Sequence, residues 1–204
     1  LIGENGCGKT TLFNAYTGAN LKVANWPGVT VEKVEGAIKD HDMTIRLVDL
    51  PGTYSLTSYT MEEQVSRQFI LSDEVDVIID VATLTGACVV ALGSAASGIM
   101  GNNQSLIDKL IKCGNIGGER LWQLPMFEEY KDSLKSDVAD MRNTGSRQGG
   151  TQTAALFLQN FVKKAHWAHI DIAGTAFIDK PINEIMSKGA TGAGVRTLLN
   201  FILN

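Results

Sequence analysis

The stretch Gly3-Glu4-Asn5-Gly6-Cys7-Gly8-Lys9-Thr10 satisfies the pattern G-x-x-x-x-G-K-[ST] at every fixed position. Glycines in such a loop let consecutive backbone N–H groups converge on phosphate oxygens, and the N-terminus of a following helix adds partial positive charge. An apolar stub, Leu1-Ile2, precedes the loop, and a helix is expected to open over 10–17. The stretch therefore predicts an α/β fold that begins with a phosphate-binding loop.

Two later positions fit a nucleotide site that contains Mg²⁺. Asp49 follows an apolar run and precedes Pro51-Gly52, which is expected of a Mg²⁺-side aspartate and a glycine at the γ-phosphate; an ordinary strand-to-turn exit has the same residues. Thr30 lies between the motifs, either as a Mg²⁺ ligand or as a plain strand residue. The expected nucleotide contacts are Gly3, Asn5, Gly6, Gly8, Lys9, Thr10, Thr11 and Gly52, and the expected Mg²⁺ ligands are Thr10, Thr30 and Asp49.

Composition places the chain among globular proteins. Of 204 residues, 44% are hydrophobic and 20% charged, and the net charge of −4 does not favour a nucleic-acid partner. Three cysteines without a CxxC pair fit a reducing cytoplasm. The long uncharged run over 81–107 contains polar residues and glycines, so we interpret it as a buried strand and loop and expect no membrane segment.

Hydrophobic periodicity and turn residues predict alternating strands and helices. Strands are expected over 31–39, 44–50, 75–81 and 167–173, and helices over 61–71, 105–113, 127–134, 153–162 and 194–203. Residues 20–30 are expected to form a loop. Gly114 is expected to end the helix over 105–113. Beyond residue 81 the sequence becomes rich in glycine and alanine, so 75–83 is the predicted junction between two parts.

The first part resembles the cytosolic G domain of ferrous iron transport protein B. The residues that carry the resemblance are Gly8 to Ala15, Thr17-Gly18, Asn25 to Lys33 and Asp49 to Leu56. The resemblance covers about residues 1–80 and implies binding of GTP with Mg²⁺, in a domain that regulates a permease for Fe²⁺. The chain departs from that family at Gly6, where the family has Asn, and it lacks the guanine-reading Asn/Thr-Lys-x-Asp element. Thr53 stands where a water-positioning Gln would favour hydrolysis, so any hydrolysis is expected to be slow.

The second part resembles the catalytic domain of leucyl (cytosol) aminopeptidases over about residues 76–204. The strings that carry this resemblance are Ile78 to Ala87, Gly118 to Pro125, Lys135 to Asp140, Thr153 to Leu158, Trp167 to Thr175 and Ala190 to Arg196. That family hydrolyses peptides with two divalent metals and forms hexamers, so the resemblance implies peptides and a homo-oligomer as partners. Its substrate-side residues carry over to Thr83, Leu84, Gly86 and, more weakly, Ala173.

The metal-binding motif of the aminopeptidases, Asn-Thr-Asp-Ala-Glu-Gly-Arg, occurs nowhere in this sequence. Mn²⁺ or Zn²⁺ is therefore expected only if that site is restored elsewhere. His169 and Asp171 would share one face of a strand, near His166, but two ligands bind a metal weakly and we interpret them as polar residues near a sheet end. Glu119 beside Arg120 is interpreted as an ion pair or a solvated turn, and Asp137 and Asp140 as capping or loop residues.

The sequence thus predicts an α/β fold with parallel strands in both parts. Residues 1–78 would form a partial P-loop GTPase sheet of Rossmann-like type, and 79–204 a partial leucyl-aminopeptidase α/β domain. Three hypotheses about a cytoplasmic protein follow: a GTP-type phosphate and Mg²⁺ site, an aminopeptidase-family protein with weak or lost activity, and a non-catalytic oligomerisation module or recombined gene product. The resemblances alone leave all three open.

Overall fold

The computed structural model describes residues 13–14, 21–25, 32–40, 43–49, 61, 64–65, 68, 75–180 and 188–204. The chain divides into two compact units, Leu1–Val75 and Asp76–Asn204. Of the predicted nucleotide site, only Asp49 lies among the described residues, as the last residue of a strand. The loop from Gly3 to Thr11, Thr30 and Gly52 lie outside them, so their roles stay predictions.

The described strands of the first unit form an antiparallel sheet. Its order is β1 (Leu21–Asn25), β2 (Glu32–Asp40) and β3 (Met43–Asp49), with β2 in the middle. The register places Asp40 opposite Met43. A connection of two residues can join antiparallel strands but is too short to join parallel ones. The predicted parallel pairing is therefore wrong for these strands, while the predicted strands over 31–39 and 44–50 are confirmed. Residues 13–14, 61, 64–65 and 68 are helical, within the helices predicted there.

Strand β1 contradicts the prediction of a loop over 20–30. Its sequence, Leu-Lys-Val-Ala-Asn, begins with the alternation of apolar and polar residues that is typical of a strand. The turn residues Pro27-Gly28 nearby led the prediction to extend the loop too far. Pairing along the whole of β1, from Leu21 opposite Gly36 to Asn25 opposite Glu32, satisfies backbone groups that a loop would leave to solvent.

The second unit contains a mixed four-stranded sheet in the order β4-β7-β5-β6. The strands are β4 (Val77–Ala82), β5 (Ser97–Gly101), β6 (Leu121–Gln123) and β7 (His166–Asp171). Strands β4 and β7 are parallel, as are β5 and β6, but β5 runs antiparallel to β7. The α/β fold class and the predicted parallel strands are confirmed for this unit, and the sheet contains in addition an antiparallel pair, β5–β7.

Gly101 explains how β5 fits against β7. A Cβ at this position would lie 2.3 Å from the carbonyl oxygen of Trp167, closer than real Cβ atoms approach. Only glycine therefore lets the two backbones meet here. The apolar pattern around Gly101 predicts a buried segment, but it does not predict the antiparallel pairing with a strand that follows 66 residues later in the sequence.

Helices occupy the segments between these strands. They are α3 (Gly86–Leu92), α4 (Gln104–Gly117), the 3₁₀ helix η1 (Glu128–Leu134), α5 (Gly150–Gln159) and α6 (Val195–Leu203), and a small hairpin pairs β8 (Phe177–Ile178) with β9 (Gly189–Ala190). Helix α3 and strand β5 both lie in the uncharged run that we interpreted as strand and loop, so a helix was missed there. Within the described residues, no helix is both long and apolar enough to span a bilayer.

Gly114 does not end α4, contrary to the prediction. The helix continues to Gly117 and ends at Gly118, whose φ of 70° gives the left-handed cap. Gly114 is instead a packing glycine, because a Cβ there would lie 2.5 Å from the carbonyl oxygen of Glu119. Its role is to let the chain leading into β6 pass close to the helix.

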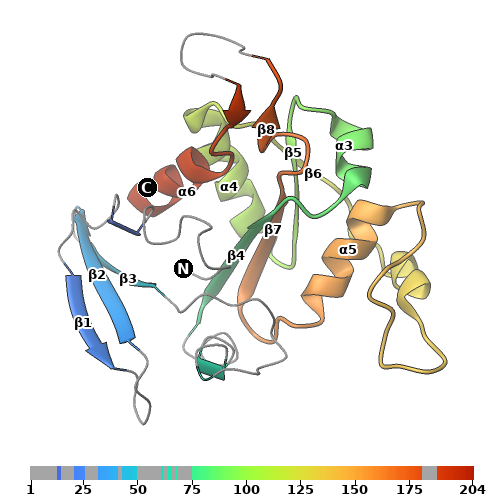
Figure 1. Ribbon diagram of the computed structural model, residues 1–204, viewed down its shortest axis with the longest axis horizontal. Helices are drawn as coiled ribbons and strands as arrows, with labels where there is room; N and C mark the ends of the chain where they lie inside the picture. Colours follow the sequence, from blue (N-terminus) through green and yellow to red (C-terminus); the bar gives the residue numbers. More distant parts are fainter. Residues whose placement is uncertain are drawn as a thin grey trace. The chain divides into compact units, whose positions relative to one another are not determined.

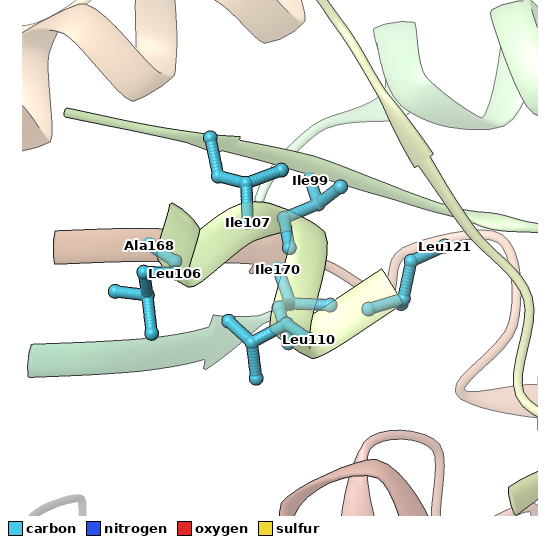
Figure 2. Close-up of a cluster of buried hydrophobic side chains, with 7 residues drawn as sticks. All are labelled: Ile99, Leu106, Ile107, Leu110, Leu121, Ala168 and Ile170. Atoms are coloured by element: carbon cyan, nitrogen blue, oxygen red, sulfur yellow. The ribbon is translucent and has the colours of Figure 1, made fainter. Parts of the chain in front are cut away.

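The helices form layers on the two faces of the sheet (Figure 1). Helices α4 and α6 pack together on one face, and α3 and α5 pack together on the other. Figure 2 shows the buried cluster of the first face, where α4 meets β5, β6 and β7. Its members are Ile99, Leu106, Ile107, Leu110, Leu121, Ala168 and Ile170. The opposite face is built around Met100, Ala155 and Trp167.

Two isoleucines on α4 test whether this cluster stabilises the fold. Ile107 is 2% exposed and Ile116 is 60% exposed, so the same substitution meets opposite environments on one helix. We expect Ile107→Ala to lower the free energy of unfolding by about 2–5 kcal/mol, because it leaves a cavity in the core. Ile116→Ala should change it by less than about 0.5 kcal/mol. Urea unfolding measures both, and equal losses would contradict the described orientation of α4.

Candidate functional site

The buried carboxylate of Asp171 organises the edge where β4 and β7 both end. Because the two strands are parallel, the residues after them lie at the same edge of the sheet. Asp171 has no exposed surface, and its Oδ1 atom accepts hydrogen bonds from the backbone N–H of Leu84, at 3.2 Å, and of Ala173, at 3.1 Å. One oxygen thus holds the loop after β4 and the residue after β7 together.

Thr85 connects this carboxylate to helix α3. Its hydroxyl donates to Oδ2 of Asp171 over 2.7 Å and, as the N-cap, accepts from the backbone N–H of Cys88 over 3.0 Å. The hydroxyl also lies 3.0 Å from that of Thr151 in α5. Since Thr85 has one hydroxyl hydrogen and gives it to Asp171, Thr151 is the donor in that pair. Both oxygens of Asp171 therefore accept hydrogen bonds.

A cavity of about 570 Å³ lies beside this network. Residues from α3, from the loop before α5 and from α5 itself contribute to its wall, among them Thr85, Gly86, Arg147 and Thr151. The wall is mostly apolar, with Ala87, Val90, Ala91 and Leu124 on it. A Cβ added to Gly86 would have no atom within 4 Å, so this glycine faces open space. The cavity is large enough for an amino-acid side chain and has polar groups at its rim.

The structure brings together three of the four predicted substrate-side residues. Leu84 and Ala173 share one oxygen of Asp171, and Gly86 lines the cavity next to Thr85. Thr83 lies exposed in the same loop, one residue before Leu84. No prediction had assigned Asp171 this positioning role. Thr85, a threonine directly before a helix, carries an N-cap signal that sequence reasoning could have used.

His169 and Asp171 do lie on one face of β7, but they bind different partners. The Nδ1 atom of His169 is hydrogen-bonded to Oδ1 of Asp80, whose Oδ2 accepts from the indole N–H of Trp167 at 2.7 Å. His166 pairs through Nδ1 with the side-chain amide of Asn103. Among the described residues, no group of three His, Cys, Asp or Glu side chains is placed to hold a metal ion. The interpretation of these residues as polar groups near a sheet end agrees with these contacts.

Cys88 carries a buried thiol, and its backbone N–H donates to the hydroxyl of Thr85. Burial raises its pKa above the ordinary value of 9.0, the nearby charge of Asp171 raises it further, and a hydrogen bond involving the Gly98 backbone lowers it in part. Burial likewise raises the pKa of Cys113 on α4, against a smaller opposing effect of Lys109 and Lys112. Both thiols are therefore protonated at neutral pH and contribute to packing as small apolar groups.

Two family models match this chain. Residues 67–199 match the cytosol aminopeptidase family, catalytic domain, and residues 1–86 match ferrous iron transport protein B. Both resemblances inferred from the sequence are therefore confirmed at the level of the family models.

Individual relatives agree with the first of these matches. A probable cytosol aminopeptidase of Geobacter sp. (strain M21) is 57% identical over 125 residues, which are 61% of this chain and 25% of that protein. Its counterpart from Gloeobacter violaceus is 54% identical over 129 residues, which are 63% of this chain and 25% of that protein. A solved mutant of tomato leucine aminopeptidase superposes with a TM-score of 0.62 and 41% identity, over 70% of this chain and 28% of that one. The chain thus spans about a quarter of the length of the curated relatives it matches.

Substitutions at Thr85 test the network around Asp171. Thr85→Val removes a helix cap and a hydrogen bond to a buried carboxylate, so we expect a loss of about 1–3 kcal/mol in the free energy of unfolding. Thr85→Ser keeps the hydroxyl and should recover most of that loss. Thr144→Val, in an exposed loop, is the matched control and should have little effect. Denaturant unfolding that ranks Thr85→Ser with Thr85→Val would show that the hydroxyl contributes nothing.

Proposed function

This chain belongs to the cytosol aminopeptidase family, and from this premise we propose that residues 76–204 bind the N-terminal residue of a peptide where β4 and β7 end. The observation that carries the proposal is the hydrogen bonding of Asp171 to Leu84, Thr85 and Ala173. These bonds fix a loop and a helix start around an open, mostly apolar cavity. A site of this kind is preorganised, so little order is lost when a ligand binds.

The proposed substrate contacts follow from that arrangement. The side chain of the N-terminal residue enters the cavity beside Gly86, where there is free space and an apolar wall. Thr83 and Leu84, both exposed in the loop that leads to this glycine, lie toward the peptide backbone. We expect a preference for peptides with an aliphatic N-terminal residue. The side chains of Val90, Ala91 and Leu124 in the cavity wall are apolar, so contact with them favours an apolar ligand side chain.

The resemblance implies two divalent metals, Mn²⁺ or Zn²⁺, whose chemistry is to activate water and polarise the peptide carbonyl. The described side chains do not fit such a pair, because no three His, Cys, Asp or Glu side chains among them are placed to hold a metal ion. We therefore derive binding, and no hydrolytic step, from this part of the chain. Hydrolysis by the chain alone is expected to be weak or absent.

We also propose that the protein is cytoplasmic and forms a homo-oligomer. The proposal includes the division of the chain into two domains, residues 1–78 and residues 79–204.

Blocking the cavity tests peptide binding. We expect L-leucyl-glycinamide to bind the full chain saturably, and Gly86→Leu to weaken that binding by about tenfold or more, because the new side chain fills the open space. Ala139→Leu, in an exposed loop, adds the same side chain elsewhere and should leave affinity unchanged. Calorimetric titration measures both variants. Equal affinity of Gly86→Leu and the unsubstituted chain would reject the cavity as the binding site. Hydrolysis of leucine anilide with added Mn²⁺ or Zn²⁺ is measured in parallel.

A second candidate function is supported by the match of residues 1–86 to ferrous iron transport protein B. We propose that the loop from Gly3 to Thr10 binds the phosphates of a GTP-type nucleotide with Mg²⁺, using Lys9, Thr10, Thr30 and Asp49. Among these, the structure describes Asp49 alone, at the end of β3, and strands commonly deliver the Mg²⁺-side aspartate in this position. Slow hydrolysis and an open base preference are expected because Thr53 replaces Gln and no guanine-reading element is present.

Lys9→Ala tests this second candidate. Removing the lysine that reaches the β and γ oxygens should weaken binding of a fluorescent GTP analogue by roughly a hundredfold, and binding should depend on Mg²⁺. Lys39→Ala in β2 removes a lysine outside the loop and is the matched control. A parallel titration with the ATP analogue reports base preference. If affinity is the same with and without Lys9, the phosphate site does not exist.

A further inference from the structure

Strand β4 lies at an edge of its sheet but has the sequence of a central strand. In the part of the chain that the structure describes, it pairs with β7 on one side and with no strand on the other (Figure 1). Its sequence, Val-Ile-Ile-Asp-Val-Ala, is apolar except at Asp80. Apolar runs are typical of strands inside a sheet, whereas edge strands usually carry Lys, Pro or a bulge that prevents further pairing. Strand β4 contains no Lys or Pro, and its register with β7 runs without a bulge, so its free edge can accept another strand.

The hydrogen bonds to β7 determine which backbone groups of β4 point to the free edge. The backbone N–H of His166 donates to the oxygen of Asp76. The backbone N–H of Ile172 donates to the oxygen of Ala82. In a parallel pair, every second residue of a strand bonds to the same neighbour, so the even-numbered residues of β4 bond to β7. The residues whose N–H and C=O groups point outward are therefore Val77, Ile79 and Val81.

The outward residues of β4 read the same in both directions around Ile79. When two such strands meet antiparallel, opposite residues exchange two N–H···O bonds only where both point outward. The register centred on Ile79 pairs all three outward positions, with Ile79 opposite its own copy and Val77 opposite Val81 on either side. Pairs of β-branched side chains are favourable across neighbouring strands. The edge of β4 is thus complementary to itself.

Asp80, the one charged residue of β4, does not oppose this pairing. In the register centred on Ile79, it lies opposite Ile78 of the second copy, so the two Asp80 side chains do not face each other. Its carboxylate already bonds to the ring of His169 and to the indole N–H of Trp167. Pairing through the backbone therefore leaves no additional charge without a partner.

We infer that two copies of the chain associate through β4, antiparallel and related by a two-fold axis at Ile79. The two four-stranded sheets then form one continuous sheet. A second copy fits this edge because its outward residues match in number, spacing and shape. The inference specifies the contact of the homo-oligomer proposed above. It is separate from peptide binding, because association is measured without a ligand.

Sedimentation equilibrium of the full chain tests this association. Dimers should form, and Val77→Pro should weaken them about tenfold or more, because each copy loses one outward N–H donor. The N–H of Val77 does not bond to β7, and proline is tolerated at the first residue of a strand, so the sheet should remain folded. Val77→Thr keeps the N–H and the β-branched shape and is the matched control. A monomeric chain, or equal association of Val77→Pro and Val77→Thr, would overturn the inference.

Amide hydrogen exchange identifies the strand that pairs. In the dimer, the amides of Ile79 and Val81 should exchange as slowly as those of Asp80 and Ala82, which bond to β7. In Val77→Pro, diluted until it is monomeric, Ile79 and Val81 should exchange fast while Asp80 and Ala82 remain slow. Fast exchange of Ile79 and Val81 in the dimer would place the contact elsewhere and overturn the inference. Slow exchange of both in the monomer would also overturn it, because the same chain would then cover this edge.

Discussion

The second unit depends on a single buried carboxylate. Asp171 stands at the end of the central strand β7, with no exposed surface, and such a group is tolerated only when its oxygens are satisfied. Leu84, Thr85 and Ala173 satisfy them, and in doing so they fix the loop after β4 and the start of α3. The same hydrogen bonds that satisfy this buried carboxyl group therefore define the geometry of the candidate peptide site.

The two faces of the sheet have different chemistry. On the α3–α5 face, polar groups of Asp171, Thr85 and Thr151 are bonded to one another, and the cavity beside them is mostly apolar. On the α4–α6 face, Glu119 accepts from the backbone N–H and the hydroxyl of Thr197 at the start of α6 and lies 3.5 Å from the Nε atom of Arg196. A satisfied network of this kind holds a fixed shape beside the apolar cavity.

Sequence reasoning predicted the α/β class and most elements of the second unit, because apolar runs and helix periodicity are local signals. The predictions failed where contacts between residues far apart in the sequence determine the structure. Gly114 reads as a helix stop but is a packing glycine, since the chain at Glu119 passes against it. The antiparallel pairing of β5 with β7 joins segments far apart in the sequence, which no local pattern encodes, and Gly101 permits the close approach of the two backbones. Substrate-side residues were predicted through resemblance, but the contacts of Asp171 involve a loop 87 residues away in the sequence.

Amide hydrogen exchange at Leu84 and Ala173 tests the central claim most directly. Both amides lie outside the strands and helices, yet each donates to Oδ1 of Asp171. We expect them to exchange slowly and at similar rates, close to the amides of β7, while the exposed loop amide of Asn143 exchanges fast. Exchange of Leu84 and Ala173 as fast as that of Asn143 would contradict the claim that Asp171 holds this edge together.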